Sequence, residues 1–375
     1  MTRIAVAHFI NPFLPITQNW MYHQLRFNTE CRHIVLCQTL ENADIFPCET
    51  VFPAFKKNHL FARASMVLAR ARAQYFSGHY LKVIEREKPS VLHGHFSWES
   101  WRNFGLINKT RLPLVTTFYG LDVNKLARLP QWQKRYALLF QRGEIFTVEG
   151  PHMALALRAI GCPERKIRVV PIGVDIEKIS AAVVPKDPSV LKIMFVGLER
   201  EKKGPLFAAA AFARIAAINK NMELHVVGDG PYRAPVRKLL AEAGVLDQSI
   251  FHGYIPFESY CALLGRMDIV LAPSVTTENG DTEGGAPVVV IEAQSAGIPV
   301  VGTLHCDIPS IVIHDKTGLL CAERDVDALA KNLGRLVSDQ GLLEKLGRAA
   351  RIHAREHFSI RRQVKDLNEI YGSLV

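Results

Sequence analysis

Residues 279–301 read NGDTEGGAPVVVIEAQSAGIPVV, a loop rich in glycine and acids followed by a short apolar element. Pro287 suits the first position of a helix, because an N–H there would have no intrahelical partner. Gly297 and Pro299 are typical of a helix end. The stretch therefore predicts a helix that begins at Pro287 and stops before Gly297. The β-branched run 288–291 also fits a buried strand, so both interpretations stay open.

Two carboxylates accompany this element, Glu283 just before it and Glu292 within it. The first turn of a helix has free backbone N–H groups, which form a positive end that attracts an anion. The pattern thus predicts a phosphate or sugar site between the two acids. The structural alternative is that Glu283 is a helix-start charge and Glu292 a paired surface acid.

Strand-like runs alternate with helical ones along almost the whole chain, which indicates an α/β fold of parallel sheets with helices on both faces. The runs occupy residues 4–9, 33–37, 91–96, 114–118, 145–149 and 167–173 in the first half, and 191–197, 223–228, 250–253, 269–274 and 299–303 in the second. At 375 residues the chain is long enough for two domains. Residues 177–188, with two prolines, are the best candidate for a linker.

The composition favours a cytoplasmic protein. Hydrophobic residues make up 48% of the chain, yet no apolar run approaches the roughly 20 residues of a membrane span. No signal peptide precedes the strand-like run at 4–9. The seven cysteines show neither metal spacing nor an even number, which fits a reducing compartment.

The net charge of +10 lies wholly in the first half of the chain. Residues 1–175 hold 23 Lys and Arg against 12 Asp and Glu, and the remainder holds 23 against 24. A basic half can serve an anionic substrate, a membrane surface or nucleic acid, or it can be a solvated face without a partner. Residues 55–80 place Lys and Arg among apolar residues at helical spacing. They predict either a helix lying on an anionic membrane, where each cation gains ~1 kcal/mol, or a helix facing the core.

Polar candidates follow the strand-like runs of the first half. The run 4–9 lacks the G-x-G-x-x-G of dinucleotide sites, which counts against a nicotinamide enzyme. Thr17 and Gln18 precede an apolar helix instead, where they are N-caps or face a ligand beyond the strand ends. His93 and His95 share one face of a strand. Because we expect no third ligand nearby, we predict no metal site.

The acidic loop and the helix with the second glutamate resemble the signature of the family 4 retaining glycosyltransferases, whose fold is called GT-B. The family usually has seven residues between its two glutamates, whereas Glu283 and Glu292 enclose eight. The resemblance continues through HGHF (93–96), TTFYGLD (116–122), VVPIGVD (169–175), VVGDGP (226–231) and HGYIP (252–256).

This resemblance implies two Rossmann-like domains that face each other across a cleft. Residues 1–176 would form an acceptor-binding domain and residues 177–357 a domain that binds the nucleotide sugar. Residues 358–375 would return to the first domain as a helix.

Roles for individual residues also come from the resemblance. Glu283 would grip the donor sugar, and Glu292 would hold the ribose diol. The backbone next to the donor diphosphate would be that of Gly284, Gly285, Ala286, Pro287 and Val288.

The remaining roles fall on residues of three other motifs, at 116–122, 195–204 and 252–256. Tyr119 stands where the family has a histidine near the donor sugar. Lys203, in FVGLEREKKG (195–204), takes the place of a phosphate-binding lysine. Leu198 replaces the family's arginine, so Arg200 is the candidate substitute. The backbone of Tyr254 and Ile255 would border the nucleotide base.

The function that this resemblance implies is transfer of a sugar from a UDP- or GDP-sugar to a glycan or lipid-linked acceptor, at the inner face of the membrane. Lys203 and the helix amides would receive the charge of the leaving diphosphate without a metal, so we expect no cofactor besides the donor. One alternative is a nucleotide-sugar isomerase on the same architecture. Another is a basic module for nucleic acid, but that class favours clustered cations with exposed aromatics, whereas the charges here are spread.

Overall fold

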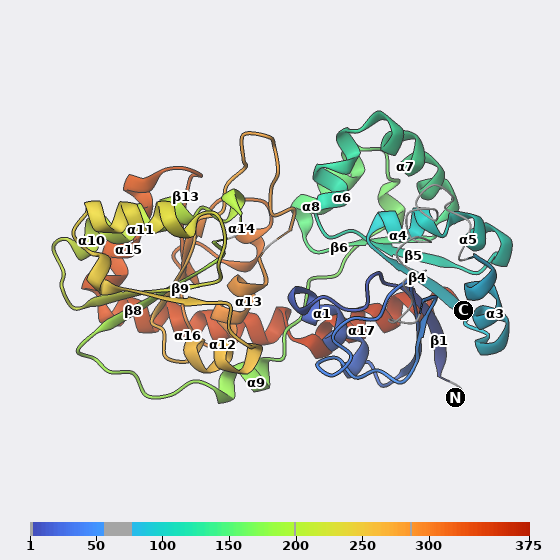
Figure 1. The fold of residues 1–375 in the computed structure, drawn as a ribbon, viewed down its shortest axis with the longest axis horizontal. Helices are drawn as coiled ribbons and strands as arrows, with labels where there is room; N and C mark the ends of the chain where they lie inside the picture. The colour runs from blue at the N-terminus through green and yellow to red at the C-terminus, as the bar shows by residue number, and fades with distance from the viewer. Residues whose placement is uncertain (1–2, 56–76, 199, 286) are drawn as a thin grey trace. The chain divides into compact units, whose positions relative to one another are not determined.

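The structure is a computed structural model that describes residues 3–55, 77–198, 200–285 and 287–375 (Figure 1). It forms two compact units, Met1–Gly173 with Ile360–Val375, and Val174–Ser359. The sequence placed the corresponding borders at 176/177 and 357/358. The predicted linker is only partly irregular, because helix α9 (Ile176–Ala181) occupies its first part and belongs to the second unit.

The first unit contains a parallel seven-stranded sheet in the order β3-β2-β1-β4-β5-β6-β7. The chain builds outward from β1 to one edge, returns to β4 beside β1, and then builds to the other edge. Ligands of such sheets bind beyond the carboxyl ends of the strands at this switch point. The strands are β1 (Ile4–Phe9), β2 (Cys31–Cys37), β3 (Val51–Pro53), β4 (Val91–His95), β5 (Leu114–Thr117), β6 (Ile145–Val148) and β7 (Ile167–Val169).

Helices cover both faces of this sheet, as the side-chain alternation of its strands requires. On β1, Ala5, Ala7 and Phe9 pack with α3 (Ser77–Glu87) and α5 (Phe104–Thr110). Val6 faces the other side and packs with Leu367 and Tyr371 of α17 (Ile360–Gly372). The predicted return of the last helix to the first unit is therefore confirmed. The other α-helices described in this unit are α1 (Asn19–Phe27), α4 (Ser97–Arg102), α6 (Leu121–Asn124), α7 (Pro130–Arg142) and α8 (Pro151–Ala159).

The second unit repeats this plan with six parallel strands in the order β10-β9-β8-β11-β12-β13, so its switch point lies between β8 and β11. The strands are β8 (Leu191–Val196), β9 (Met222–Val227), β10 (Ser249–Gly253), β11 (Ile269–Ala272), β12 (Val300–Thr303) and β13 (Gly318–Cys321). Its other α-helices are α10 (Pro205–Ala216), α11 (Arg233–Glu242), α12 (Phe257–Leu264), α13 (Val288–Ser295), α14 (Ile308–Ile311), α15 (Val326–Ser338) and α16 (Gln340–His357).

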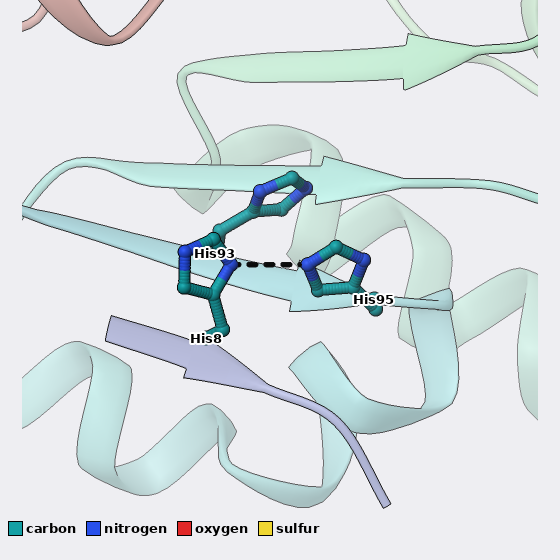
Figure 2. Close-up of side chains that lie close together, drawn as sticks. All are labelled: His8, His93 and His95. Carbon is teal, nitrogen blue, oxygen red and sulfur yellow. Dashed lines mark hydrogen bonds between the residues drawn. The ribbon is translucent and has the colours of Figure 1, made fainter. Parts of the chain in front are cut away.

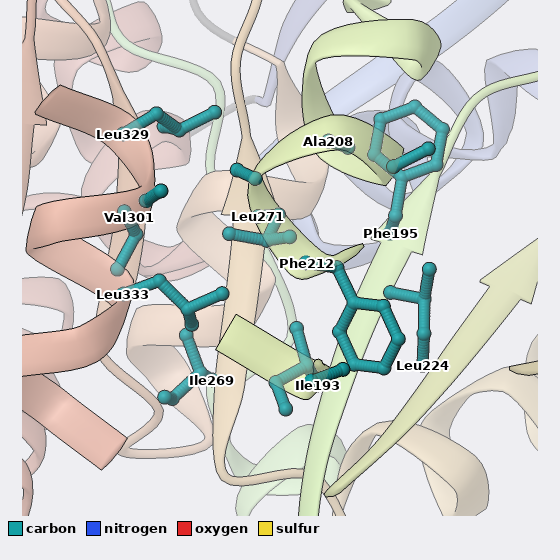
Figure 3. Packing of buried hydrophobic residues seen from close by; sticks show 14 of the residues in the cluster. Ile193, Phe195, Ala208, Phe212, Leu224, Ile269, Leu271, Val301, Leu329 and Leu333 are labelled. Carbon is teal, nitrogen blue, oxygen red and sulfur yellow. The ribbon is translucent and has the colours of Figure 1, made fainter. Parts of the chain in front are cut away.

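The core of the second unit forms where α10 and α15 lie on the sheet (Figure 3). Phe212 of α10 packs beside Ile193 of β8, and Leu333 of α15 lies toward Val301 of β12. Burying one such side chain stabilises the fold by roughly 1.5–3 kcal/mol. This packing gives the loops at the carboxyl ends of the strands a rigid base.

The predicted fold class is confirmed in that the chain forms two Rossmann-like domains. That they face each other across a cleft stays a prediction. Of the basic segment 55–80, residues 56–76 lie outside the described residues. Within the described ranges, no helix has both the length and the apolarity needed to cross a membrane.

Candidate functional site

The stretch after Ala286 forms helix α13, so the interpretation of residues 288–291 as a strand is wrong. Val290 and Ile291 are buried, and this packing outweighs the strand preference of β-branched residues. Pro287 is the N-cap and not the first helical residue, because its ψ of 132° is extended. Ala286 itself lies outside the described residues. Val288 thus opens the first turn, one residue later than predicted.

Lys203 and Glu283 meet at the switch point of the second sheet. Lys203 ends a short 3-10 helix after β8, and Glu283 lies in the loop after β11. The Lys203 Nζ lies 3.1 Å from the Glu283 Oε2. The Ser274 hydroxyl donates to the Glu283 Oε1 at 2.9 Å. The Glu283 side chain is only 6% exposed, so these two residues, which the resemblance identified separately, form a largely desolvated ion pair.

Two glycines allow these loops to approach each other. Gly204 has a φ of 70°, and a Cβ there would lie 2.0 Å from the carbonyl oxygen of Pro273. A Cβ on Gly197 would lie 2.7 Å from the Cγ of Lys203. The adjacent Lys202 donates to the carbonyl oxygen of Thr282 at 2.7 Å. The two lysines therefore hold the acidic loop on one side.

A histidine holds the same loop on the other side. The backbone N–H of Glu283 donates to the His305 Nε2 at 3.1 Å, and the His305 Nδ1 lies 2.6 Å from the Glu323 Oε1. Because Nε2 accepts, the proton of the neutral ring is on Nδ1 and points to the carboxylate. The sequence did not single out His305 or Glu323 as site residues. The only available signal was their position after β12 and β13, at the carboxyl edge of the sheet.

Glu292 is buried, so the interpretation as a surface acid is wrong. The hydroxyl of Tyr260, on α12, donates to its Oε2 at 2.8 Å. Burial raises the pKa of Glu292 to about 7. This carboxyl therefore gains or loses its proton near neutral pH, and a ligand that donates hydrogen bonds to it would favour the charged form.

The other predicted residues of the second unit lie on separate loops. Leu198 is fully buried in the core, and Arg200 is exposed, so whether Arg200 substitutes for the family arginine stays a prediction. Tyr254 is 72% exposed and its hydroxyl donates to the carbonyl oxygen of Asp229 at 2.9 Å. Ile255 is half-buried beside it. This places the predicted base-binding backbone next to the loop after β9.

The remaining predicted residues belong to the first unit. Gln18 occupies the N-cap position of α1, as predicted, but its side chain makes no capping hydrogen bond. The side chain of Thr17 lies outside the described part of the structure. The Tyr119 ring packs with Trp20 and Phe96, at centroid distances of 4.4 and 4.7 Å.

Three histidines gather at the switch point of the first sheet (Figure 2). The register of β1 with β4 places His8 directly beside His93, and His95 follows on the same face. Our expectation that no third potential ligand lies near His93 and His95 is therefore wrong. We call His8, His93 and His95 the histidine cluster. Burial lowers the pKa of all three well below the usual range, so the rings are neutral at pH 7.

Comparison with known proteins matches the two halves of the chain to consecutive family descriptions. Residues 42–178 match "Glycosyltransferase Family 4", and residues 177–353 match "Glycosyl transferases group 1".

Individual relatives agree with these matches. WcaL of Escherichia coli, whose name assigns it to colanic acid biosynthesis as a glycosyltransferase, is 35% identical over 62% of this chain and 56% of its own length. The amylovoran biosynthesis glycosyltransferase AmsK of Erwinia amylovora is 31% identical over 69% of this chain and 64% of its own length. The chain thus spans under two thirds of these relatives.

Solved structures share the fold over the whole chain. A glycosyltransferase from Rickettsia africae has a TM-score of 0.79 at 16% identity and covers 100% of this chain and 99% of its own. Anabaena HepE in complex with UDP has a TM-score of 0.77 at 15% identity, and the match covers 99% of this chain and 100% of HepE. The family matches, the relatives and the two parallel-sheet domains agree: the chain belongs to the group 1 glycosyl transferases of family 4, which have the GT-B fold.

Proposed function

We propose that this chain transfers a sugar from a nucleotide-sugar donor to a glycan or lipid-linked acceptor in polysaccharide or glycolipid synthesis. One observation carries the proposal: an ion pair at the switch point of the second sheet. Its cation is Lys203, on the segment after β8, and its carboxylate is Glu283, on the loop that leads into α13. The names of WcaL and AmsK, which refer to polysaccharide biosynthesis, support the acceptor class. HepE was solved with UDP-glucose, which supports the donor class.

The leaving group of such a transfer is a nucleoside diphosphate, whose charge grows as the glycosidic bond breaks. Lys203 and the free N–H groups in the first turn of α13 are the groups that would receive this charge. This arrangement supplies positive charge from the protein itself, so we propose that no metal is needed. Retention of configuration at the sugar follows only from the family resemblance.

The ion pair also suggests how the donor enters. In the structure, the Glu283 carboxylate pairs with the ammonium group of Lys203. A bound diphosphate would take over that ammonium group and release the carboxylate to accept hydrogen bonds from sugar hydroxyls. Glu292 would accept both hydroxyls of the ribose, because a carboxylate has two oxygens. Donor binding would therefore rearrange the pair without leaving either charge unpaired.

Thermal unfolding with a panel of UDP- and GDP-sugars tests this function. A ligand at 100 times its Kd stabilises the folded state by about 2.7 kcal/mol, which raises the Tm by roughly 5–10 °C for a unit of this size. We expect this shift with at least one nucleotide sugar, with or without EDTA, and we expect Lys203→Gln to remove most of it. The matched control is Lys238→Gln, because Lys238 is exposed on α11.

Two outcomes would contradict the proposal. A panel without any shift would remove the donor site. Consumption of the stabilising nucleotide sugar at the same rate without any acceptor would favour the isomerase. Contact with an anionic membrane and work at its cytoplasmic face stay predictions.

A further inference from the structure

Four side chains of the first unit form a continuous row of hydrogen bonds that the proposed chemistry does not use. The row starts at the backbone carbonyl of Asn28, which lies 2.9 Å from the His33 Nε2. The His33 Nδ1 lies 2.9 Å from the His8 Nε2, and the His8 Nδ1 lies 3.1 Å from the His95 Nε2. The His95 Nδ1 lies 2.8 Å from the Tyr119 hydroxyl. We call this row the histidine row.

The carbonyl at its start sets the direction of every bond in the row. A carbonyl oxygen only accepts, so the proton of His33 must be on Nε2. A neutral imidazole has one N–H, so its Nδ1 accepts from the Nε2–H of His8. The same argument makes His95 donate to His8 and leaves the Nδ1 of His95 as an acceptor. The Tyr119 hydroxyl is the remaining partner, and it must donate.

Charge states in the row agree with this geometry. Burial lowers the pKa of His8, His33 and His95, which keeps each ring neutral with a single N–H. Burial also raises the pKa of Tyr119, so its hydroxyl keeps its proton. His93, Tyr371, Thr117 and Thr147 lie beside the row on neighbouring strands and α17, and they are uncharged at pH 7. Thr117 also hydrogen-bonds Tyr119, and the carboxyl groups of Glu149 and Asp122 lie near enough to add to the raised pKa of Tyr119.

His93, the third member of the cluster, has no such fixed direction. Its Nδ1 lies 2.7 Å from the Tyr371 hydroxyl and its Nε2 lies 2.7 Å from the Thr117 hydroxyl. A hydroxyl can donate or accept, so either tautomer satisfies both bonds. All six nitrogens of the cluster thus have partners, and a metal ion would have to displace several of these bonds. The arrangement favours a hydrogen-bonded row over a metal site.

We propose that the histidine row fixes the Tyr119 proton toward His95, so that Tyr119 offers a ligand only the lone pairs of its oxygen. Tyr119 would then select a ligand group that donates a hydrogen bond, such as a sugar hydroxyl, and disfavour a phosphate oxygen, which only accepts. His33, His8 and His95 are positioning residues that act through Tyr119. Only the identity of the ligand as a sugar substrate depends on the proposed function.

NMR of the full chain with ¹⁵N-labelled histidine tests the direction of the row without any activity measurement. At pH 7 we expect His33, His8 and His95 all to carry their proton on Nε2. Because the direction comes from the Asn28 end, Tyr119→Phe should leave these tautomers unchanged. An Nδ1–H tautomer or a doubly protonated ring at any of the three would overturn the proposal, and so would a change of tautomer in Tyr119→Phe.

A pair of variants at the far end of the row tests its effect on the ligand. In His33→Asn, the side-chain oxygen can replace Nδ1 as the acceptor for His8. In His33→Gln, the amide reaches the Nε2 position and leaves His8 without that acceptor. We expect His33→Gln to lose several-fold more affinity for UDP-glucose than His33→Asn does.

Two controls separate positioning from a general structural effect. Affinity for UDP, which lacks the sugar, should be the same in both His33 variants and in Tyr119→Phe. In a Tyr119→Phe background, His33→Gln should have no further effect on UDP-glucose binding, because its influence passes through the tyrosine. Additive losses, or equal losses for UDP and UDP-glucose, would contradict the proposal. A failed donor site would instead abolish UDP binding while leaving the NMR result intact.

Discussion

Glu292→Gln should stabilise the second unit at high pH and weaken nucleotide binding at the same time. The ordinary pKa of an unfolded glutamate is about 4.3, whereas burial raises that of Glu292 to about 7 in the folded chain. Between these values the folded chain holds more protons, so its stability falls as the pH rises. The difference corresponds to about 4 kcal/mol at pH 8. Glutamine cannot ionise and avoids this cost.

The expected advantage of Glu292→Gln in unfolding free energy is therefore about 4 kcal/mol at pH 8 and about 1 kcal/mol at pH 5. For a unit of this size the pH 8 value corresponds to a Tm increase of roughly 8–16 °C. Thermal unfolding of both proteins across this pH range measures it, and UDP titration shows the accompanying loss of affinity. An advantage that does not depend on pH would refute the buried carboxyl, and unchanged UDP affinity would refute its contact with ribose.

Two further predictions concern stability. Gly204→Ala should lower the unfolding free energy by about 2 kcal/mol or more, because the new methyl group would overpack against Pro273. Gly244→Ala is the control: its φ of 68° is similar, but nothing lies within 4 Å of the added Cβ, so it should cost only about 1 kcal/mol. Urea unfolding compares the two variants, and equal losses of stability would refute the contact with Pro273. Acidification from pH 7 toward pH 5 should destabilise the first unit by up to about 4 kcal/mol per pH unit. In this range the unfolded chain protonates the three residues of the histidine cluster and the folded chain does not. An unfolding free energy that stays constant over this range would contradict their burial as neutral rings.

Most strands could be predicted because β-branched runs bounded by glycine and proline are local signals. Strands β3 and β13 were missed for a physical reason. Both are edge strands of three and four residues, and each pairs with one neighbour only. In β13, a Cβ on Gly318 would lie 2.4 Å from the carbonyl oxygen of Val300, so this strand depends on a close approach that its own sequence does not reveal.

Helix α13 shows where local pattern is ambiguous. Its β-branched residues fit a strand equally well, and the burial of Val290 and Ile291 in the folded unit decides for the helix. The family resemblance identified Lys203 and Glu283 separately. Their ion pair joins residues 80 positions apart, and it follows only from the strand order that places β8 beside β11.

The histidine cluster was missed for the same reason. Alternation along one strand correctly placed His93 and His95 on one face, but His8 comes from a strand 85 positions earlier than His93. Only the pairing of β1 with β4 brings it there. The fixed direction of the histidine row requires, in addition, the carbonyl of Asn28, which no sequence pattern indicates.

The central claim is that Lys203 leaves Glu283 to bind the diphosphate of the donor, and calorimetric titration with UDP and with uridine tests it most directly. A charge-assisted hydrogen bond contributes about 1.5–3 kcal/mol, so Lys203→Gln should weaken UDP binding by roughly 10- to 100-fold and leave uridine binding unchanged. Lys238→Gln should bind both as the unmodified chain does. UDP affinity that survives in Lys203→Gln, or an equal loss for UDP and uridine, would contradict the account.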